Sequence, residues 1–181
     1  IMTPTGEVAV EDLATGDLVM TMDNGAQPIR WIGGRRFSAA MLEAAPNLRP
    51  IRIAAGAMGA DRDLVVSPQH RMLVSGPRAE MLFGETEVLA SAKDLVDGDR
   101  IFTDAADDVE YFHILFDDHQ IVYANGAPSE SFHPGLQALT SSTLRIQAEI
   151  FEIFPELREM SSDRPLARMV LKAYEARTLV A

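Results

Sequence analysis

Residues 66–74 read VSPQHRMLV, and residues 118–126 read DHQIVYANG. Each stretch places a histidine beside a run of apolar, β-favouring residues, His70 just after one run and His119 just before another. Ser67 stands three residues ahead of His70, and the pair Asn125-Gly126, a strong turn signal, follows the second run. The two stretches therefore predict strands that carry proton-transferring side chains at their ends.

A repeat links two distant parts of the chain. Residues 9–21 read AVEDLATGDLVMT and residues 91–103 read SAKDLVDGDRIFT, and they align without gaps. In each copy a Gly-Asp turn leads into an extended apolar stretch, because glycine allows a positive φ and aspartate can bond its own backbone. Two similar turns can arise by chance, but we favour a duplicated β-unit with pseudo-two-fold symmetry.

Short apolar segments separated by turn residues predict an all-β (mainly β) fold built from hairpins. The expected strands are Glu7–Val10, Leu18–Met22, Ile29–Ile32, Ile51–Ala54, Leu64–Val66, Met72–Val74, Glu87–Leu89, Arg100–Phe102, Val109–Phe116 and Ile121–Ala124. The expected turns include Gly33-Gly34, Gly76-Pro77 and Asn125-Gly126.

Helices are expected at Ala39–Ala45 and in the region after Leu136. Helical spacing predicts one helix over Ser142–Phe154, and Pro165, suited to a first turn, predicts a second running through Leu179. We therefore divide the chain into a β-domain over residues 1–131 and a helical C-terminal extension over residues 132–181. No Pro/Ser-rich linker separates them, so we expect the extension to pack on the β-domain.

Composition narrows the classes of function. The 27 acidic and 16 basic residues give a net charge of −11, which argues against binding to nucleic acid. Hydrophobic residues make up 47% of the chain and support a folded core, yet no apolar run approaches the ~18 residues of a membrane span. The absence of cysteine excludes disulfides, thiolate metal sites and Cys nucleophiles within these residues. The chain starts at Ile1 without a signal sequence, so we expect a piece of a longer protein.

The candidate site residues are His70, Ser67, His113 and His119. A histidine can give or take a proton near pH 7, and the Pro-fixed turn lets Ser67 and His70 reach the same point. Taken one at a time, each histidine is better explained as a structural residue than as a catalytic one. Asp117-Asp118, taken alone, is better explained as a solvated turn.

Together these features resemble the Hint (hedgehog/intein) family of self-processing domains. The resemblance covers about residues 1–131: Val66–Val74 looks like the family's Thr-x-x-His block with Ser67 in the Thr place, and Phe112–Gly126 looks like its late block. Residues 28–33 (PIRWIG) and 129–132 (SESF) resemble a bacterial branch with further chain after the domain. The resemblance implies a pseudo-two-fold, intertwined β-fold.

The resemblance also implies a reaction. A Cys or Ser nucleophile would attack the preceding carbonyl in an N-to-S or N-to-O acyl shift, and water would then release an upstream passenger. His70 would protonate the leaving nitrogen, Ser67 would help hold it, and His113 or His119 would accept the nucleophile's proton or tune His70. This is single-turnover autocatalytic cleavage that needs no metal or cofactor, and its partner is the chain's own upstream polypeptide.

Two departures from the family pattern limit the expectation. The nucleophile would lie upstream of Ile1, so the chain as printed is expected to be inert. Glu130-Ser131 replace the His-Asn that ends an intein, so Asn cyclisation is not expected.

Two other functions stay open from sequence: a Hint fold that no longer processes and serves as a binding or scaffold module, and a metal-dependent hydrolase using His70, His113, His119 and Asp117 or Asp118. The bacterial resemblance suggests a secreted or surface protein.

Overall fold

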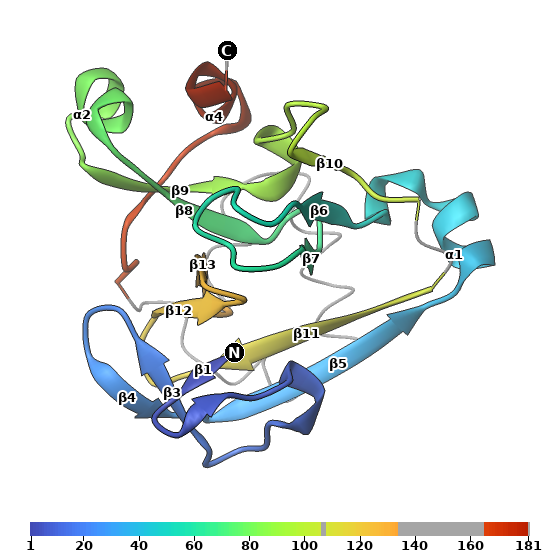
Figure 1. Cartoon of the computed structure of the whole chain (residues 1–181), viewed down its shortest axis with the longest axis vertical. Helices are drawn as coiled ribbons and strands as arrows, with labels where there is room; N and C mark the ends of the chain where they lie inside the picture. Colours follow the sequence, from blue (N-terminus) through green and yellow to red (C-terminus); the bar gives the residue numbers. More distant parts are fainter. Residues whose placement is uncertain (106–107, 134–164, 181) are drawn as a thin grey trace.

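The protein is built mainly from β-strands, as a computed structural model describes it for residues 1–105, 108–133 and 165–180 (Figure 1). The strands are β1 (Met2–Thr3), β2 (Gly6–Glu7), β3 (Leu18–Thr21), β4 (Gly25–Pro28), β5 (Trp31–Phe37), β6 (Ile51–Ile53), β7 (Leu64–Val66), β8 (Arg71–Ser75), β9 (Glu87–Ser91), β10 (Ile101–Thr103), β11 (Val109–Leu115), β12 (Ile121–Ala124), β13 (Ala127–Glu130) and β14 (Met169–Val170). The helices are α1 (Ala39–Ala44), α2 (Pro77–Phe83) and α4 (Ala173–Val180), with 3₁₀ turns η1 (Val10–Asp12), η2 (Pro46–Leu48) and η3 (Ala92–Asp94). The predicted mainly-β class is confirmed.

The largest sheet has the strand order β14-β9-β8-β13-β12-β3-β4. A three-stranded sheet, β10-β6-β7, and the long antiparallel pair β11-β5 complete the body, with β1 and β2 forming a small hairpin at the start of the chain. In Figure 1 the N-terminus lies near the middle of the molecule, beside β11. Ile1 packs against both main apolar clusters, so the first residue of the chain lies between them.

The two copies of the repeat agree in backbone conformation before their 3₁₀ turns and at the glycine, but differ between these points, because Leu13 is extended with φ/ψ of −80°/146° whereas its counterpart Leu95 has −101°/3°. Residues Ala9 and Ser91, which precede η1 and η3, have φ/ψ of −61°/140° and −63°/136°. Gly16 and Gly98 have positive φ of 97° and 81°, and each copy then enters a strand, β3 or β10. Leu13 belongs to one apolar cluster and its counterpart Leu95 to the other. The repeat therefore supplies equivalent units to two cores, as expected for the pseudo-two-fold fold.

The Asn125-Gly126 turn closes the hairpin that forms the middle of the largest sheet. Both residues have positive φ, 47° and 82°, and the loop between the paired residues Ala124 and Ala127 is two residues long. This is the type I′ geometry that suits the twist of a hairpin. The turn folds β13 back between β12 and β8, so Glu130 at the end of β13 comes to lie beside Arg71 at the start of β8.

Several predicted boundaries were wrong. Only Glu7 of the expected strand Glu7–Val10 is in a strand, because η1 starts at Val10. The expected strand Ile29–Ile32 is interrupted, because the buried Ile29 lies where the chain leaves β4 and turns into β5. Gly33-Gly34 is not a turn but lies inside β5, opposite β11.

The predicted helix Ala39–Ala45 agrees with α1, but one helix was missed and another begins later than predicted. Helix α2 was missed: Pro77 occupies its first turn and Gly84, with φ of 75°, ends it, a pairing that favours helix boundaries. The predicted helix from Pro165 begins only at Ala173, because Met169–Val170 instead form β14, parallel to β9. The expected helix Ser142–Phe154 lies outside the described residues.

The described part of the C-terminal segment packs on the β-body. Leu171 and Ala176 are buried in the larger apolar cluster, and the Leu171 N–H donates to the Leu89 carbonyl at 2.9 Å. Arg168 pairs with Glu87 at 2.6 Å and with Asp23 at 2.8 Å, which ties the segment to β9 and to the β3–β4 turn. Among the described residues, none of the helices has the length and apolar character needed to cross a membrane.

Candidate active site

The Ser67–His70 turn presents its side chains at the end of a strand. Pro68 occupies the second position of this turn, where its fixed φ is favoured, and the His70 N–H donates to the Ser67 carbonyl at 3.0 Å. The turn is anchored on its other side, because the Ala92 N–H donates to the His70 carbonyl at 2.9 Å. The residues that carry the candidate chemistry therefore sit on a fixed backbone between β7 and β8.

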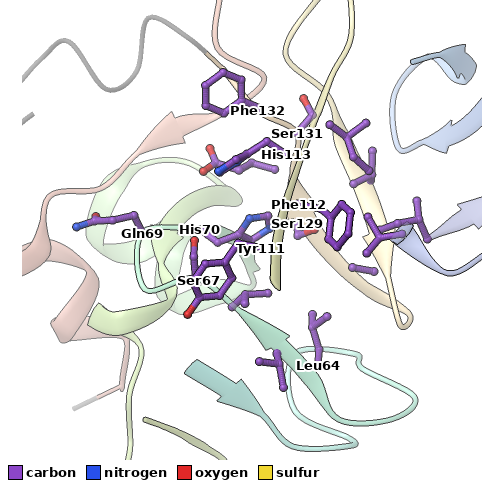
Figure 2. Close-up of a pocket in the computed structure, with 18 of the residues that line it drawn as sticks. Leu64, Ser67, Gln69, His70, Tyr111, Phe112, His113, Ser129, Ser131 and Phe132 are labelled. Atoms are coloured by element: carbon purple, nitrogen blue, oxygen red, sulfur yellow. The ribbon is translucent and has the colours of Figure 1, made fainter. Parts of the chain in front are cut away.

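A cavity of about 170 Å³ gathers side chains from distant parts of the chain (Figure 2). It is lined by Ser67 and His70 from the turn, by His113 from β11, and by Ile1 at the chain's start. The remaining walls come mainly from β7, β11 and the end of β13. Three of the four candidate site residues thus face one space that the first residue also reaches.

His70 offers an unoccupied ring nitrogen at this cavity. Its Nε2 is buried and has no hydrogen-bond partner among the residues that the structure describes. A buried polar atom without a partner is costly, so it marks a place where a ligand group or water would bind. Burial lowers the pKa of His70 below its ordinary value, the charge of Glu130 opposes this, and the charge of Arg71 adds to it.

The groups that determine the pKa of His113 differ from those that act on His70. Its ring packs against Phe132, with ring centroids 5.0 Å apart. Burial, and then the positive charge of nearby His70, lowers the pKa of His113 to about 4, with Glu130 acting in the opposite direction. His113 is therefore a neutral imidazole at pH 7, able to accept a proton.

His119 does not line the cavity. It lies behind Glu130, with its Nε2 3.5 Å from Glu130 Oε2, and its side chain is fully buried. On its other side the Ala167 N–H donates to His119 Nδ1 at 3.2 Å, and the ring meets His133 edge-on at 5.1 Å. The structure thus brings His70, Ser67 and His113 together at the cavity. His119 lies outside the cavity lining and contacts Glu130.

Two further residues at the site were not singled out from the sequence as functional. Glu130 lines the cavity, and Arg71 donates to it from its backbone N–H at 3.1 Å and from Nη1 at 3.2 Å. The sequence signal that points to the position of Glu130 is the two-residue turn Asn125-Gly126. This turn fixes the β12–β13 register and so pairs Glu130 with Ile121. Ser131 is buried, and its Oγ accepts the Gln120 N–H at 2.9 Å.

The positions of the His, Asp and Glu side chains can be compared with those that a metal-dependent hydrolase would need. Within residues 1–105, 108–133 and 165–180, no three His, Asp or Glu side chains are grouped so that they could hold a metal ion. Asp117, one of the carboxylates considered for such a site, is instead exposed and ion-paired with Arg30.

Comparisons with known proteins identify the family of the chain. The chain matches the family described as the Hint domain over residues 1–136. The crystal structure of the MchDnaB-1 intein is 13% identical, with 70% of this chain and 92% of that chain covered and a TM-score of 0.45. A variant of the same intein, also 13% identical, has a TM-score of 0.46 with 72% and 93% covered. No curated protein matches the chain.

Proposed function

The chain belongs to the Hint-domain family, and we propose that it is an autoprocessing domain that cleaves the peptide bond joining it to an upstream passenger polypeptide. One observation carries the proposal: the buried, unpartnered Nε2 of His70 is at a cavity that is also lined by Ser67, His113 and the first residue of the chain. A polypeptide continuing upstream of Ile1 would leave from this cavity.

The reaction begins with a Cys or Ser in the segment that precedes Ile1. Its thiol or hydroxyl attacks the carbonyl carbon of the residue before it, and its proton passes to the neutral ring of His113. The peptide C–N bond breaks as a C–S or C–O bond forms, and His70 gives its proton to the departing nitrogen. Water then adds to the ester carbonyl, and the passenger leaves as a free carboxylic acid.

His113 is the better candidate for the base. It lines the cavity, and its low pKa of about 4 leaves it unprotonated at pH 7. His119 has its Nδ1 engaged by the Ala167 N–H and its Nε2 directed at Glu130, so its influence on the cavity would pass through that carboxylate.

Ser67 would position the scissile nitrogen. Asn cyclisation, the step that releases an intein at its end, would not occur. The positions that match an intein's terminal residues hold Glu130 and Ser131, and neither has a side-chain amide. In this proposal residues 1–131 form the processing domain, and residues 132–181 are an extension whose described part packs on it.

The test is a fusion in which a passenger and a Cys-bearing segment precede Ile1. We expect passenger release over hours, accelerated by dithiothreitol, because thiols attack thioesters. His70→Ala should lower the rate about 10²–10⁴-fold, the usual contribution of general acid–base catalysis. Added imidazole should restore part of it by occupying the space of the missing ring. Ser67→Ala should slow release less.

Ser75→Ala is the matched control for Ser67→Ala, because Ser75 is an exposed serine at the far end of β8. It should cleave at the parent's rate. Undiminished release from His70→Ala would refute the mechanism. If the parent fusion released no passenger, the protein would instead be a binding or scaffold module with a Hint fold.

A further inference from the structure

Glu130 places a negative charge at the cavity wall that the reaction as described does not use. Its side chain is 10% exposed, and it accepts hydrogen bonds from the Arg71 backbone N–H at 3.1 Å and from Arg71 Nη1 at 3.2 Å. Burial alone would raise the pKa of Glu130, but the contact with His119 and the charges of Arg71 and His70 outweigh it, and the pKa is lowered. Glu130 is therefore a fixed carboxylate at pH 7.

The hydrogen bond from Ala167 determines how His119 meets this carboxylate. The Ala167 N–H donates to His119 Nδ1 at 3.2 Å, so Nδ1 carries no proton in this arrangement. The ring hydrogen of neutral His119 is then on Nε2, which lies 3.5 Å from Glu130 Oε2 and forms no hydrogen bond with the described residues. An imidazolium would carry hydrogens on both nitrogens and would lose the bond from Ala167. The hydrogen bond from the C-terminal segment thus orients the His119 ring so that its Nε2 is directed at Glu130.

The side chains whose charge acts on Glu130 in the described structure are basic, while Glu110 and Tyr111 of β11 also line the cavity. Arg71 approaches from β8, His70 from the preceding turn, His113 from β11, and His119 from the segment before β12. Arg71 and His119 contact the carboxylate directly, while His70 and His113 are affected by its charge. The carboxylate is the negative group that both cavity histidines experience.

We propose, building on the function proposed above, that Glu130 is a positioning residue that keeps a proton available on His70. Burial of His70 favours its neutral ring, which cannot protonate a leaving amine. The Glu130 carboxylate counters this, and Arg71 and His119 hold it in place. The Ala167–Arg168 segment, clamped to Glu87 and Asp23, supports His119 from behind and so links the C-terminal part of the chain to the cavity.

The direct test follows the ring of His70 by NMR through a pH titration of the chain as printed, without any passenger. The chain has only four histidines, so single His→Gln variants assign the signals. Glu130→Gln should lower the titration midpoint of His70, because the negative charge of Glu130 raises the pKa of that ring. Arg71→Met should move it in the opposite direction, since the charge of Arg71 lowers the pKa of His70.

Glu43→Gln is the matched control, because it makes the same chemical change at an exposed position on α1. Its His70 midpoint should equal the parent's. Gln at position 130 keeps the size of the side chain and an acceptor for Arg71, and the fluorescence of the single tryptophan, Trp31, 6.5 Å from Phe132, reports whether the fold is kept. A midpoint in folded Glu130→Gln that is unchanged or higher than the parent's would overturn the proposal.

A second NMR readout tests the role of Ala167. The nitrogen chemical shifts of His119 should report a bare Nδ1 and a protonated Nε2 in the parent, and the reverse tautomer would contradict the assignment.

The same variants in the passenger fusion separate this proposal from the proposed function. Cleavage that needs protonated His70 slows as the pH rises through the pKa of that ring. In a plot of cleavage rate against pH, Glu130→Gln should therefore move this decline to lower pH by the change seen in the titration. If the titration moves but the parent fusion does not cleave, the proposed function fails and the assignment of Glu130 stands. If the parent cleaves but neither midpoint moves in Glu130→Gln, the positioning role fails alone.

Discussion

The two cavity histidines differ because of what surrounds each ring. His113 lies beside Phe132, and burial together with the nearby charge of His70 lowers its pKa to about 4. The pKa of His70 is lowered as well, mainly by burial, and the charge of Glu130 opposes this lowering. The two rings therefore share burial as the main cause of a lowered pKa and differ in the charged neighbours that act on them.

The low pKa of His113 predicts how stability depends on pH. The unfolded chain takes up a proton near pH 6.5, whereas folded His113 does so only near pH 4, so stability is lost as the pH falls through this interval. The loss should reach about 3 kcal/mol near pH 4. Urea unfolding of His113→Gln should show a shallower slope of unfolding free energy against pH, with a residual slope from His70. An unchanged slope would show that folded His113 titrates normally.

At the residue scale, sequence reasoning predicted which candidate side chains gather at one place better than it predicted their neighbours. Ser67, His70 and His113 meet at one cavity as expected. The placement of His119 behind Glu130 depends on the β12–β13 hairpin and on a backbone N–H from residue 167, far along the chain. Such a contact leaves no local pattern in the sequence.

The long pair β5–β11 carries His113 to the cavity, and it depends on a glycine. Gly34 lies opposite Phe112 in the register, and a Cβ at position 34 would come within 2.8 Å of Phe112 Cε1. The absence of a side chain therefore gives Phe112 its place at the cavity wall. This requirement explains why Gly33-Gly34, expected to form a turn, lies within a strand.

Gly34→Ala should destabilise the protein by about 1–3 kcal/mol, because Phe112 must leave its position to avoid the new methyl group. Urea denaturation followed by Trp31 fluorescence measures the change. In the background of Phe112→Leu, whose shorter side chain makes room, the same substitution should cost less. An equal cost in both backgrounds would show that the clash with Phe112 is not its cause.

At the element scale, strands were predicted well where apolar residues lie between clear turn residues, as in β6, β7 and β12. Prediction failed where the outcome depends on a distant partner. The segment Met169–Val170 forms a strand because β9 offers a free edge, although proline at position 165 favoured a helix start. Helix α2 was missed although Pro77 and Gly84 mark its ends.

At the scale of the whole molecule, the duplication visible in the sequence gives the fold two apolar clusters with Ile1 between them. The cavity collects side chains of β7, β11, β12 and β13 around this first residue. The repeat and the family resemblance were sufficient to predict this architecture. They could not predict the Arg71–Glu130–His119 contacts, which form only when the sheet order places β13 beside β8.

The central claim is that an acyl shift onto a nucleophile before Ile1 is assisted by His70. Mass spectrometry of a passenger fusion treated with hydrazine tests it most directly, because hydrazine captures a thioester as a passenger hydrazide. We expect the hydrazide from the parent fusion and its loss, or a reduction of about 10²-fold or more, in His70→Ala. Passenger released only as the free acid, or equal hydrazide yield from His70→Ala, would contradict the account.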